Sequence, residues 1–353
     1  MDVIPRSPTL YDEPFADPSQ IPTFLVSQLA RRDVTVSLSG DGGDELFAGY
    51  NTYFWGLRIW NHIGWMPQSL RALSARGLTM LSPSSWDSLF RMIEPILPKR
   101  LRQRNFGSKF RAMAGLLPAE SAEALYRAIL THWEASGSLV IGASGSPTLL
   151  TDRTQWKNSP NLLQYMMYHD AVMYLPDNIL VKVDRAAMGV SLETRIPLLD
   201  HRVVEFAWQL PASMKIRDGR GKWILRQVLS RYIPPALIDR PKMGFGVPIG
   251  AWLRGPMKEW AEALLDEKRL KGQGFLDPDP IRDKWDEHLS GKSDWKVPLW
   301  SALMFQAWLE HEQQTTLYET QRESTRQVRL NGDHQGLVCR LDHGVDPPHA
   351  CPS

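Results

Sequence analysis

The stretch DVTVSLSGDGGDELFAGY, residues 33–50, decides the fold of this chain. Its β-branched and apolar residues between Val34 and Leu38 predict a buried strand. The strand ends at Ser39-Gly40, and the glycines that follow allow positive φ angles and a close approach of the backbone to a ligand. Because open α/β sheets bind their ligands at the carboxyl ends of strands, this loop is the first candidate site.

The charges of the loop indicate what it could bind. Asp41, Asp44 and Glu45 would repel a bare phosphate, so they favour a Mg²⁺–nucleotide complex, a ribose or an amine. The alternative is a solvated turn in which Asp44 and Glu45 cap a helix, since short glycine motifs occur in many unrelated loops.

Composition excludes several other classes of protein. A chain of 353 residues with 43% hydrophobic residues can form two domains or one large α/β or helical domain. The net charge of +2 gives no signal for nucleic acid or a membrane surface, and no apolar run is long enough to span a bilayer. Two cysteines suit a reducing compartment, and the residues after Met1 do not form a signal peptide. We therefore expect a cytoplasmic protein without nucleic-acid or membrane partners.

Beyond Tyr50, apolar residues recur every three or four positions, which predicts a mostly helical body. The predicted helices, several bounded by prolines, cover residues 51–66, 68–80, 84–95, 119–135, 161–175, 259–270 and 295–310. From residue 313 to residue 353 the chain is polar, and we expect a poorly ordered tail. Its Cys339, His343, His349 and Cys351 match no usual zinc spacing, so we expect no metal site there.

A second cluster of charges lies at Lys182, Asp184 and Arg185. Lys182 and Arg185 are three residues apart and would lie near one face of a helix. A lysine and an arginine that converge on one site suit a polyphosphate, and Asp184 could orient Arg185 or hold Mg²⁺. The alternative is a salt-bridged helix surface without a ligand.

Four segments, in the same order along the chain, resemble the glutamine-dependent asparagine synthetase family in its ATP-pyrophosphatase synthetase domain. SLSGDGGDELFAGY resembles the second signature of that domain. The other three are DEPFADPSQIPT (Asp12–Thr23), LPDNILVKVDRAAMGVSLETRIPLLDHRVVEFA (Leu175–Ala207) and RPKMGFGVPIGAWLRGP (Arg240–Pro256). The resemblance implies an α/β fold of the adenine-nucleotide alpha-hydrolase type. We expect a parallel sheet remnant in a mostly helical body, with a synthetase-type domain over residues 1–312.

Two parts of the family pattern have no counterpart in this sequence. Family members begin with a glutaminase domain that has a nucleophilic cysteine, and their synthetase domain opens with an SGGxDS pyrophosphate loop; the cysteines here are Cys339 and Cys351, and SGGxDS does not occur. The chain therefore resembles the C-terminal part of a member, beginning inside the synthetase domain. It could be a fragment, half of a split enzyme, or a non-catalytic binding module.

The resemblance implies an ATP-dependent ligase. ATP and Mg²⁺ would activate a carboxylate, aspartate in asparagine synthetases, as an acyl-adenylate, and ammonia released from glutamine by the absent glutaminase would give asparagine, AMP and pyrophosphate. Close relatives use the same scaffold on polysaccharide or peptide precursors, and a homodimer is compatible with the family. We expect the chain to be inactive by itself.

The resemblance also assigns roles to residues. Ser39, Gly40, Asp41 and Gly42, with Lys182 and Asp184, would bind the nucleotide, whereas Asp44, Arg185 and Lys242 would act in catalysis. Lys242 lies in RPKMGFGVP (residues 240–248), where glycines and prolines impose a fixed loop around one long cation. A preorganised ammonium group there would stabilise the charge that develops during adenylation and amide formation. From the residues alone, a surface lysine in a turn is the alternative.

Overall fold

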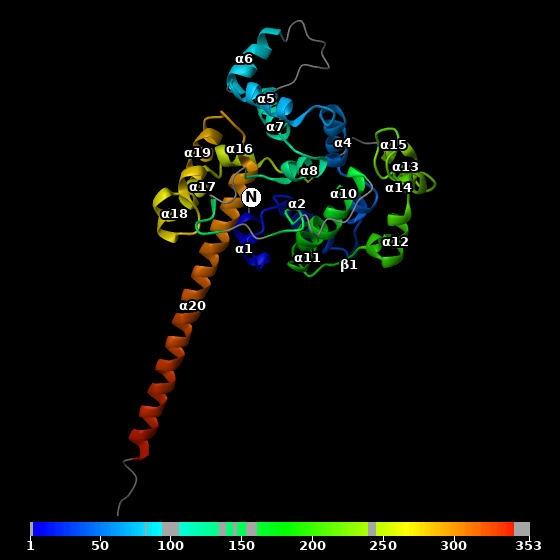
Figure 1. Cartoon of the computed structure of the whole chain (residues 1–353). Coiled ribbons are helices and arrows are strands. Elements are labelled where there is room, and N and C mark those ends of the chain that lie inside the picture. The colour runs from blue at the N-terminus through cyan, green and yellow to red at the C-terminus, as the bar shows by residue number, and fades with distance from the viewer. Residues whose placement is uncertain are drawn as a thin grey trace, which may run out of the picture.

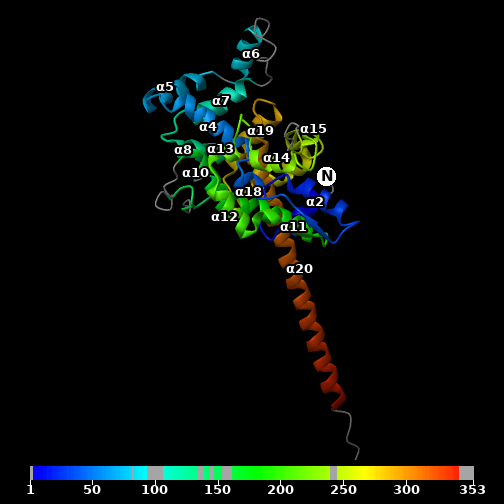
Figure 2. The same ribbon diagram turned by 90° about the vertical axis from the view of Figure 1, so that its right-hand side faces the viewer.

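The computed structural model describes residues 3–81, 83–93, 106–133, 139–143, 147–152, 161–238 and 245–341. Within these residues the chain is mostly helical, as the sequence predicts. The α-helices are α1 (Ser7–Leu10), α2 (Gln20–Ala30), α3 (Gly43–Leu46), α4 (Asn51–Ile63), α5 (Gln68–Thr79), α6 (Pro83–Ile93), α7 (Phe106–Leu116), α8 (Ala122–Leu130), α10 (Leu162–His169), α11 (Val181–Met188), α12 (His201–Gln209), α13 (Ala212–Lys215), α14 (Trp223–Leu229), α15 (Pro235–Ile238), α16 (Ile249–Arg254), α17 (Lys258–Leu264), α18 (Glu267–Gln273), α19 (Pro278–Leu289) and α20 (Lys296–Leu341). Helix α20 leaves the body as a long rod, and α5 to α7 project at the other end (Figures 1 and 2).

One small parallel sheet lies in this helical body. Strand β1 (Val36–Leu38) pairs with β2 (Glu193–Arg195), so that Ser37 lies opposite Thr194. The predicted strand near residues 34–38 and its parallel pairing are thereby confirmed.

The prediction that this strand is buried is wrong. Val36 is 40% exposed and Leu38 is 75% exposed. Alternate side chains of a strand point to opposite faces of the sheet, so these two side chains share one face. Among the described residues β1 pairs with β2 alone, and no described element covers this face.

The sequence predicts a helix over 161–175 that ends before Pro176, but the helix continues. After α10 the chain forms the π-helix η5 (Asp170–Leu180), with Pro176 inside it, and then passes directly into α11. Proline lacks the N–H that an α-helix needs and collides with the preceding turn; the wider π turn relieves this conflict. η5 packs against α3, and thus brings this long helical segment to the loop after β1.

The main hydrophobic core lies among α2, α11 and the helices from α16 to α20. Trp285 of α19 and Trp300 of α20 are the largest side chains in this core, and they are 0% and 1% exposed. A smaller core joins α4, α8 and α10 through Tyr53, Tyr126 and Met166.

In the C-terminal part of the chain, two helix boundaries differ from those predicted from the sequence. The predicted helix over 259–270 is two helices, because the Asp266 carboxylate accepts a hydrogen bond from the Arg269 N–H and so caps a new helix, α18. Helix α20 continues to Leu341, beyond its predicted end at residue 310, since glutamine, glutamate and arginine favour helix and the next proline is Pro347. Residues 342–353 lie outside the described residues, and a poorly ordered tail over 313–353 stays a prediction. Within the described part of the chain, no helix is both long and apolar enough to cross a membrane.

Candidate active site

The loop after β1 lies at the carboxyl end of the sheet, where the sequence predicts a site. The N–H of Ser39 donates to the carbonyl of Arg195 at 2.8 Å, which carries the pairing one residue past the strand. Gly42 caps α3 with φ of 79°, and a Cβ atom there would lie 2.5 Å from the side chain of Leu199. Both the backbone angle and the lack of space therefore require glycine at this turn.

The first part of the loop presents a polar edge with room in front of it. The Ser39 hydroxyl donates a hydrogen bond to the Asp41 carboxylate, and the N–H of Asp41 donates to the same hydroxyl at 3.4 Å. A Cβ atom at the exposed Gly40 would meet no atom within 4 Å. A ligand can therefore approach the backbone at Gly40 directly, with Ser39 and Asp41 beside it.

The second part of the loop holds an ion pair. The ammonium group of Lys222 lies 3.1 Å from Oδ2 of Asp44, and the two side chains are 31% and 25% exposed. Lys222 is not among the residues predicted for the site. It lies far along the chain, in the segment RDGRGK (residues 217–222), whose glycines permit a close approach to the loop. Lys222 therefore brings a positive charge to this acidic segment.

The third carboxylate of the loop does not face a ligand, contrary to expectation. Glu45 is 1% exposed, and it accepts a hydrogen bond from the Tyr50 hydroxyl at 2.6 Å. Burial raises the pKa of the Glu45 carboxyl above its ordinary value, although the Tyr50 hydrogen bond opposes this shift. Two carboxylates rather than three therefore face outward.

A second buried carboxylate, that of Asp170, lies near Glu45. Asp170, at the start of η5, accepts hydrogen bonds from the hydroxyls of Tyr53, at 2.6 Å, and of Tyr126. Burial raises the pKa of Asp170, and burial together with the Asp170 charge raises the pKa values of both tyrosines. Together with Glu45 and Tyr50, these residues form a buried polar layer, which we call the tyrosine–carboxylate layer.

The cations of α11 contact the N-terminal segment rather than the loop. Lys182 is 8% exposed, and its ammonium group binds Oδ2 of Asp17 at 2.9 Å and the hydroxyl of Ser19 at 2.8 Å. Although burial opposes it, the charge of Lys182 and the hydrogen bonds from Ser19 leave the pKa of Asp17 below its ordinary value. Lys182 thereby ties α11 to residues 17–19, and its contact with phosphate stays a prediction.

Arg185 is oriented by Asp12 and not by Asp184. Its guanidinium group lies 2.7 Å from Oδ2 of Asp12, and both side chains are well exposed. Asp184 is also exposed, so its role in nucleotide binding stays a prediction. Nearby, Arg195 pairs with Glu193 at 2.7 Å on the exposed surface of β2.

Lys242 lies outside the described residues, with the rest of 239–244. Its place beside the loop after β1 therefore stays a prediction. Of the residues predicted for the site, Ser39, Gly40, Asp41 and Gly42 form the loop after β1 and Asp44 lies in the first turn of α3, whereas Lys182 and Arg185 are bound to the segment 12–19.

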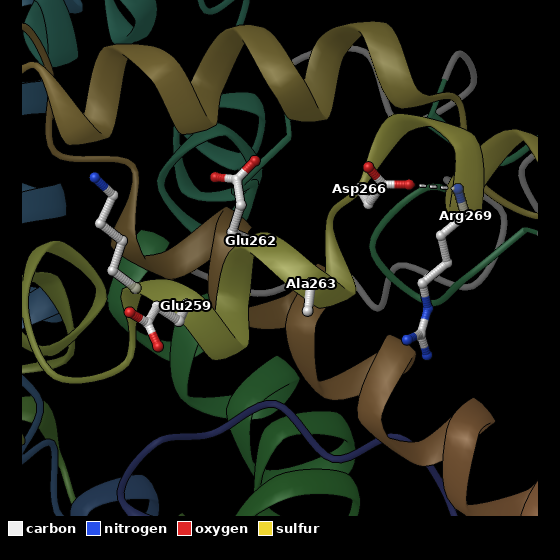
Figure 3. Close-up of a pocket in the computed structure, with 6 residues that line it drawn as sticks. Glu259, Glu262, Ala263, Asp266 and Arg269 are labelled. Carbon is white, nitrogen blue, oxygen red and sulfur yellow. Dashed lines mark hydrogen bonds between the residues drawn. The ribbon is translucent and has the colours of Figure 1, made fainter.

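A cavity of about 680 Å³ lies on α17 and α18, away from β1 (Figures 1 and 3). Lys258, Glu259, Glu262, Ala263, Asp266 and Arg269 line it. Several of these charges already have partners, since Glu262 binds Arg282 at 2.7 Å and Arg269 binds Glu310 at 3.6 Å. No residue predicted for the site lines this cavity.

Comparison with known proteins identifies a family that matches most of the chain. The family model for asparagine synthase matches residues 1–310. Asparagine synthetase (glutamine-hydrolyzing) 1 of Bacillus subtilis is 27% identical over 317 residues, which make up 87% of this chain and 45% of that protein. A Mycobacterium tuberculosis relative, provisionally named for the same activity, is 33% identical over 310 residues, or 84% of this chain and 42% of that protein. A Penicillium rubens protein named amidase chyE is 24% identical over 271 residues, or 72% of this chain and 38% of that protein.

The chain spans less than half the length of these relatives. The family match, in contrast, covers most of the chain and includes β1, the loop after it, α11 and β2. The chain therefore belongs to the asparagine synthase family.

Proposed function

We propose that this chain carries the synthetase part of an ATP-dependent ligase that forms asparagine from aspartate. The ammonia would come from glutamine, hydrolysed by a glutaminase that is not part of this sequence. Family membership and the names of the relatives support amide formation. The observation that carries the proposal is the loop after β1, where open space at Gly40 adjoins the opposite charges of Asp44 and Lys222.

The loop fits a nucleotide better than a resident metal ion. Open backbone at Gly40, with the Ser39 hydroxyl and the Asp41 carboxylate beside it, suits the hydroxyl and N–H groups of a nucleoside. In the described part of the chain, no three histidine, cysteine, aspartate or glutamate side chains gather where they could hold a metal ion. We therefore propose that Mg²⁺ arrives as the MgATP complex, held chiefly by the phosphates of its substrate.

The proposed reaction proceeds in two displacements. A carboxylate oxygen of aspartate bonds to the α-phosphorus of ATP, and the bond to the β-phosphate breaks with release of pyrophosphate. Ammonia then forms the C–N bond at the acyl carbon, AMP leaves with the electron pair of the broken C–O bond, and the nitrogen releases one proton to the solvent. Both steps concentrate negative charge, which Lys242 would stabilise, while Asp44 would hold the amino-acid substrate in place.

The two cations of α11, Arg185 and Lys182, would contribute to phosphate binding in different ways. Arg185 can turn towards a phosphate at little cost, because its pair with Asp12 is exposed and such pairs are weak. Lys182 is buried and bound by Asp17 and Ser19, so its first contribution is to hold α11 in place.

Other acyl substrates are the second candidate. The Penicillium relative, named an amidase, shows that similar sequences are not confined to proteins named for asparagine synthesis. The same scaffold could therefore act on a carboxylate of a polysaccharide or peptide precursor. A non-catalytic binding module is the third candidate.

Asparagine formation with ammonium ion tests the proposal. The enzyme would be this chain lengthened by residues encoded upstream of Met1 that include an SGGxDS segment, supplied with ATP, Mg²⁺, aspartate and ammonium. We expect asparagine and pyrophosphate in equal amounts, and Lys242→Ala should lower the rate by about two orders of magnitude. The matched control is Lys271→Ala, which removes an exposed lysine on α18. An undiminished rate in Lys242→Ala, or no asparagine from the intact enzyme, would contradict the proposal.

A further inference from the structure

The arm, by which we mean α5, α6 and α7, lies in a part of the chain that is strongly basic. Residues 51–119, which include α4 and the arm, contain ten lysines and arginines but two acidic residues, Asp87 and Glu94. The net charge of the whole chain, +2, conceals this excess, because the rest of the chain is net acidic. Figures 1 and 2 show that the arm projects from the body at the end opposite to α20. A basic, projecting element favours a negatively charged partner.

The large apolar side chains of α5 lie on its outer face. Leu70, Leu73 and Met80 are 46%, 65% and 84% exposed, and their spacing places them along one stripe of the helix. Gly77 lies within the stripe, where a Cβ atom would meet no atom within 4 Å. Trp65, in the turn before α5, is 77% exposed. Trp65, Leu70, Leu73 and Met80 are called the outer apolar residues below.

The inner face of α5 holds an arginine instead. Arg71 is 4% exposed, and its guanidinium group lies over the ring of Trp60 in α4, 5.3 Å from the centroid. Among the described residues, none accepts a hydrogen bond from its buried Nε and Nη1 atoms. A helix on the surface of a globular protein usually turns leucine inward and arginine outward. Helix α5 does the reverse, so its outer face suits contact with something other than water.

Helix α6 shows the same outward turn of apolar side chains. Leu89 and Met92 are three residues apart and therefore share a face, and they are 46% and 77% exposed, whereas Phe90 is buried. Helix α7 packs against both α5 and α6, so the three helices form one unit. The arm thus combines positive charge with exposed apolar side chains on two of its helices.

Three classes of partner compete for such a surface. Leucine and methionine side chains give no hydrogen bonds to bases or phosphates, so they do not suit a nucleic acid. A second copy of this chain would bring two basic arms together, which like-charge repulsion opposes. A bilayer with anionic lipids matches both features, because its headgroups attract arginine and its interface accepts tryptophan and leucine. Unlike a protein groove, it needs no matching shape to receive a projecting arm.

We propose that the arm is a membrane-binding element that attaches this protein to the surface of a bilayer containing anionic lipids. The outer apolar residues enter the headgroup region, and Arg76, exposed beside them on α5, contacts lipid phosphate. Attachment of this kind is peripheral and reversible, because it depends on a few side chains and on charge. The inference is independent of the proposed function, since no residue of the loop after β1 takes part in it.

Sedimentation of the 353-residue chain with lipid vesicles tests this proposal. We expect binding to vesicles of phosphatidylcholine mixed with phosphatidylglycerol, weak binding to phosphatidylcholine alone, and release at high salt. Leu73→Gln should weaken binding to the mixed vesicles at least about fivefold, since it removes an apolar side chain from the bilayer interface. Arg76→Gln should weaken it about fivefold, the effect of one positive charge at an anionic surface, and should leave the weak binding to phosphatidylcholine unchanged.

Two substitutions away from the arm are the matched controls. Leu317→Gln changes a leucine of α20 that is 64% exposed, almost the same as Leu73. Lys268→Gln changes an exposed lysine of α18 and matches Arg76→Gln. Both controls should leave vesicle binding unchanged. Thermal unfolding should give the same midpoint for all four variants, because all four side chains are exposed.

The fluorescence of Trp65 gives a second readout. Mixed vesicles should protect this side chain from quenching by acrylamide in water, because it enters the headgroup region. The Trp65→Phe variant lacks this signal, so the difference between the chain and the variant isolates Trp65 from the other tryptophans. Quenching that vesicles leave unchanged would contradict insertion of the arm.

Four further outcomes would overturn the proposal. The first is no binding to the mixed vesicles, or equal weakening by Leu73→Gln and Leu317→Gln. The second is self-association of the chain without lipid that Leu73→Gln abolishes, which would assign the arm to a second copy. The third is tighter binding of an oligonucleotide than of the vesicles. The fourth is loss of vesicle binding in the enzyme lengthened upstream of Met1, which would show that the added residues cover the arm.

Discussion

The packed core of α16 to α20 and the two-stranded sheet differ in where their large apolar side chains lie. In the core, Trp285 and Trp300 are almost completely buried. In the sheet, Val36 and Leu38 of β1 are 40% and 75% exposed, although the loop that carries the candidate site begins directly after them. The difference indicates that the helical core stabilises the chain, while β1, the strand directly before the site, adds little apolar burial.

The site nevertheless has support of another kind. The tyrosine–carboxylate layer, with Glu45 and Asp170 as its acids, lies under the loop and is held by hydrogen bonds from tyrosine hydroxyls. Buried networks of this kind fix a geometry when every member is paired, and they are costly when one member is lost. The loop is therefore positioned by these polar contacts and by the buried side chains of Leu46 and Phe47 that follow it, rather than by packing of β1.

The largest expected effect is a loss of stability when a side chain of the helical core is removed. Trp285→Ala removes a fully buried ring and should lower the free energy of unfolding by about 3–5 kcal/mol. Leu38→Ala, on the sheet, should lower it by less than about 0.5 kcal/mol, because that side chain is mostly exposed. Urea denaturation of both variants measures the difference. Similar losses for the two substitutions would mean that β1 is buried in solution, and the comparison would then fail.

A smaller effect should appear in the pH dependence of stability. Burial raises the pKa of Asp170 above its ordinary value near 3.8, so the native state keeps this proton at pH values where the unfolded chain has lost it. The free energy of unfolding should therefore fall as the pH rises from about 3.8 through the raised pKa. Asp170→Asn cannot titrate, and its fall over this window should be shallower.

Denaturation at a series of pH values measures this slope in the two proteins. The matched control is Asp283→Asn, which replaces an exposed aspartate on α19 and should leave the slope unchanged. An unchanged slope in Asp170→Asn would show that the tyrosine–carboxylate layer does not hold a proton, and that the loop is supported in another way.

Local patterns predict part of this structure, and long-range contacts decide the rest. The β-branched run before Ser39 and the glycines after it predict β1 and its loop, because both depend on neighbouring residues. The helix that continues through Pro176 could not be predicted, since a π turn depends on the packing around it. Lys222 could not be predicted for the same reason, because only the fold brings it beside Asp44. Glu45 has its partner, Tyr50, only five residues away, but its burial depends on the packing of η5 against α3.

The exchange of labelled pyrophosphate into ATP tests the central claim most directly. The chain keeps the loop after β1 and the predicted lysine loop around Lys242, but it contains no SGGxDS segment to grip pyrophosphate with backbone N–H groups. With aspartate and Mg²⁺ present, we predict no exchange by the 353-residue chain and clear exchange by the enzyme lengthened to include that segment. The Lys242→Ala variant of the chain, prepared in the same way, measures contaminating activity. Exchange by the 353-residue chain above that background would contradict the account.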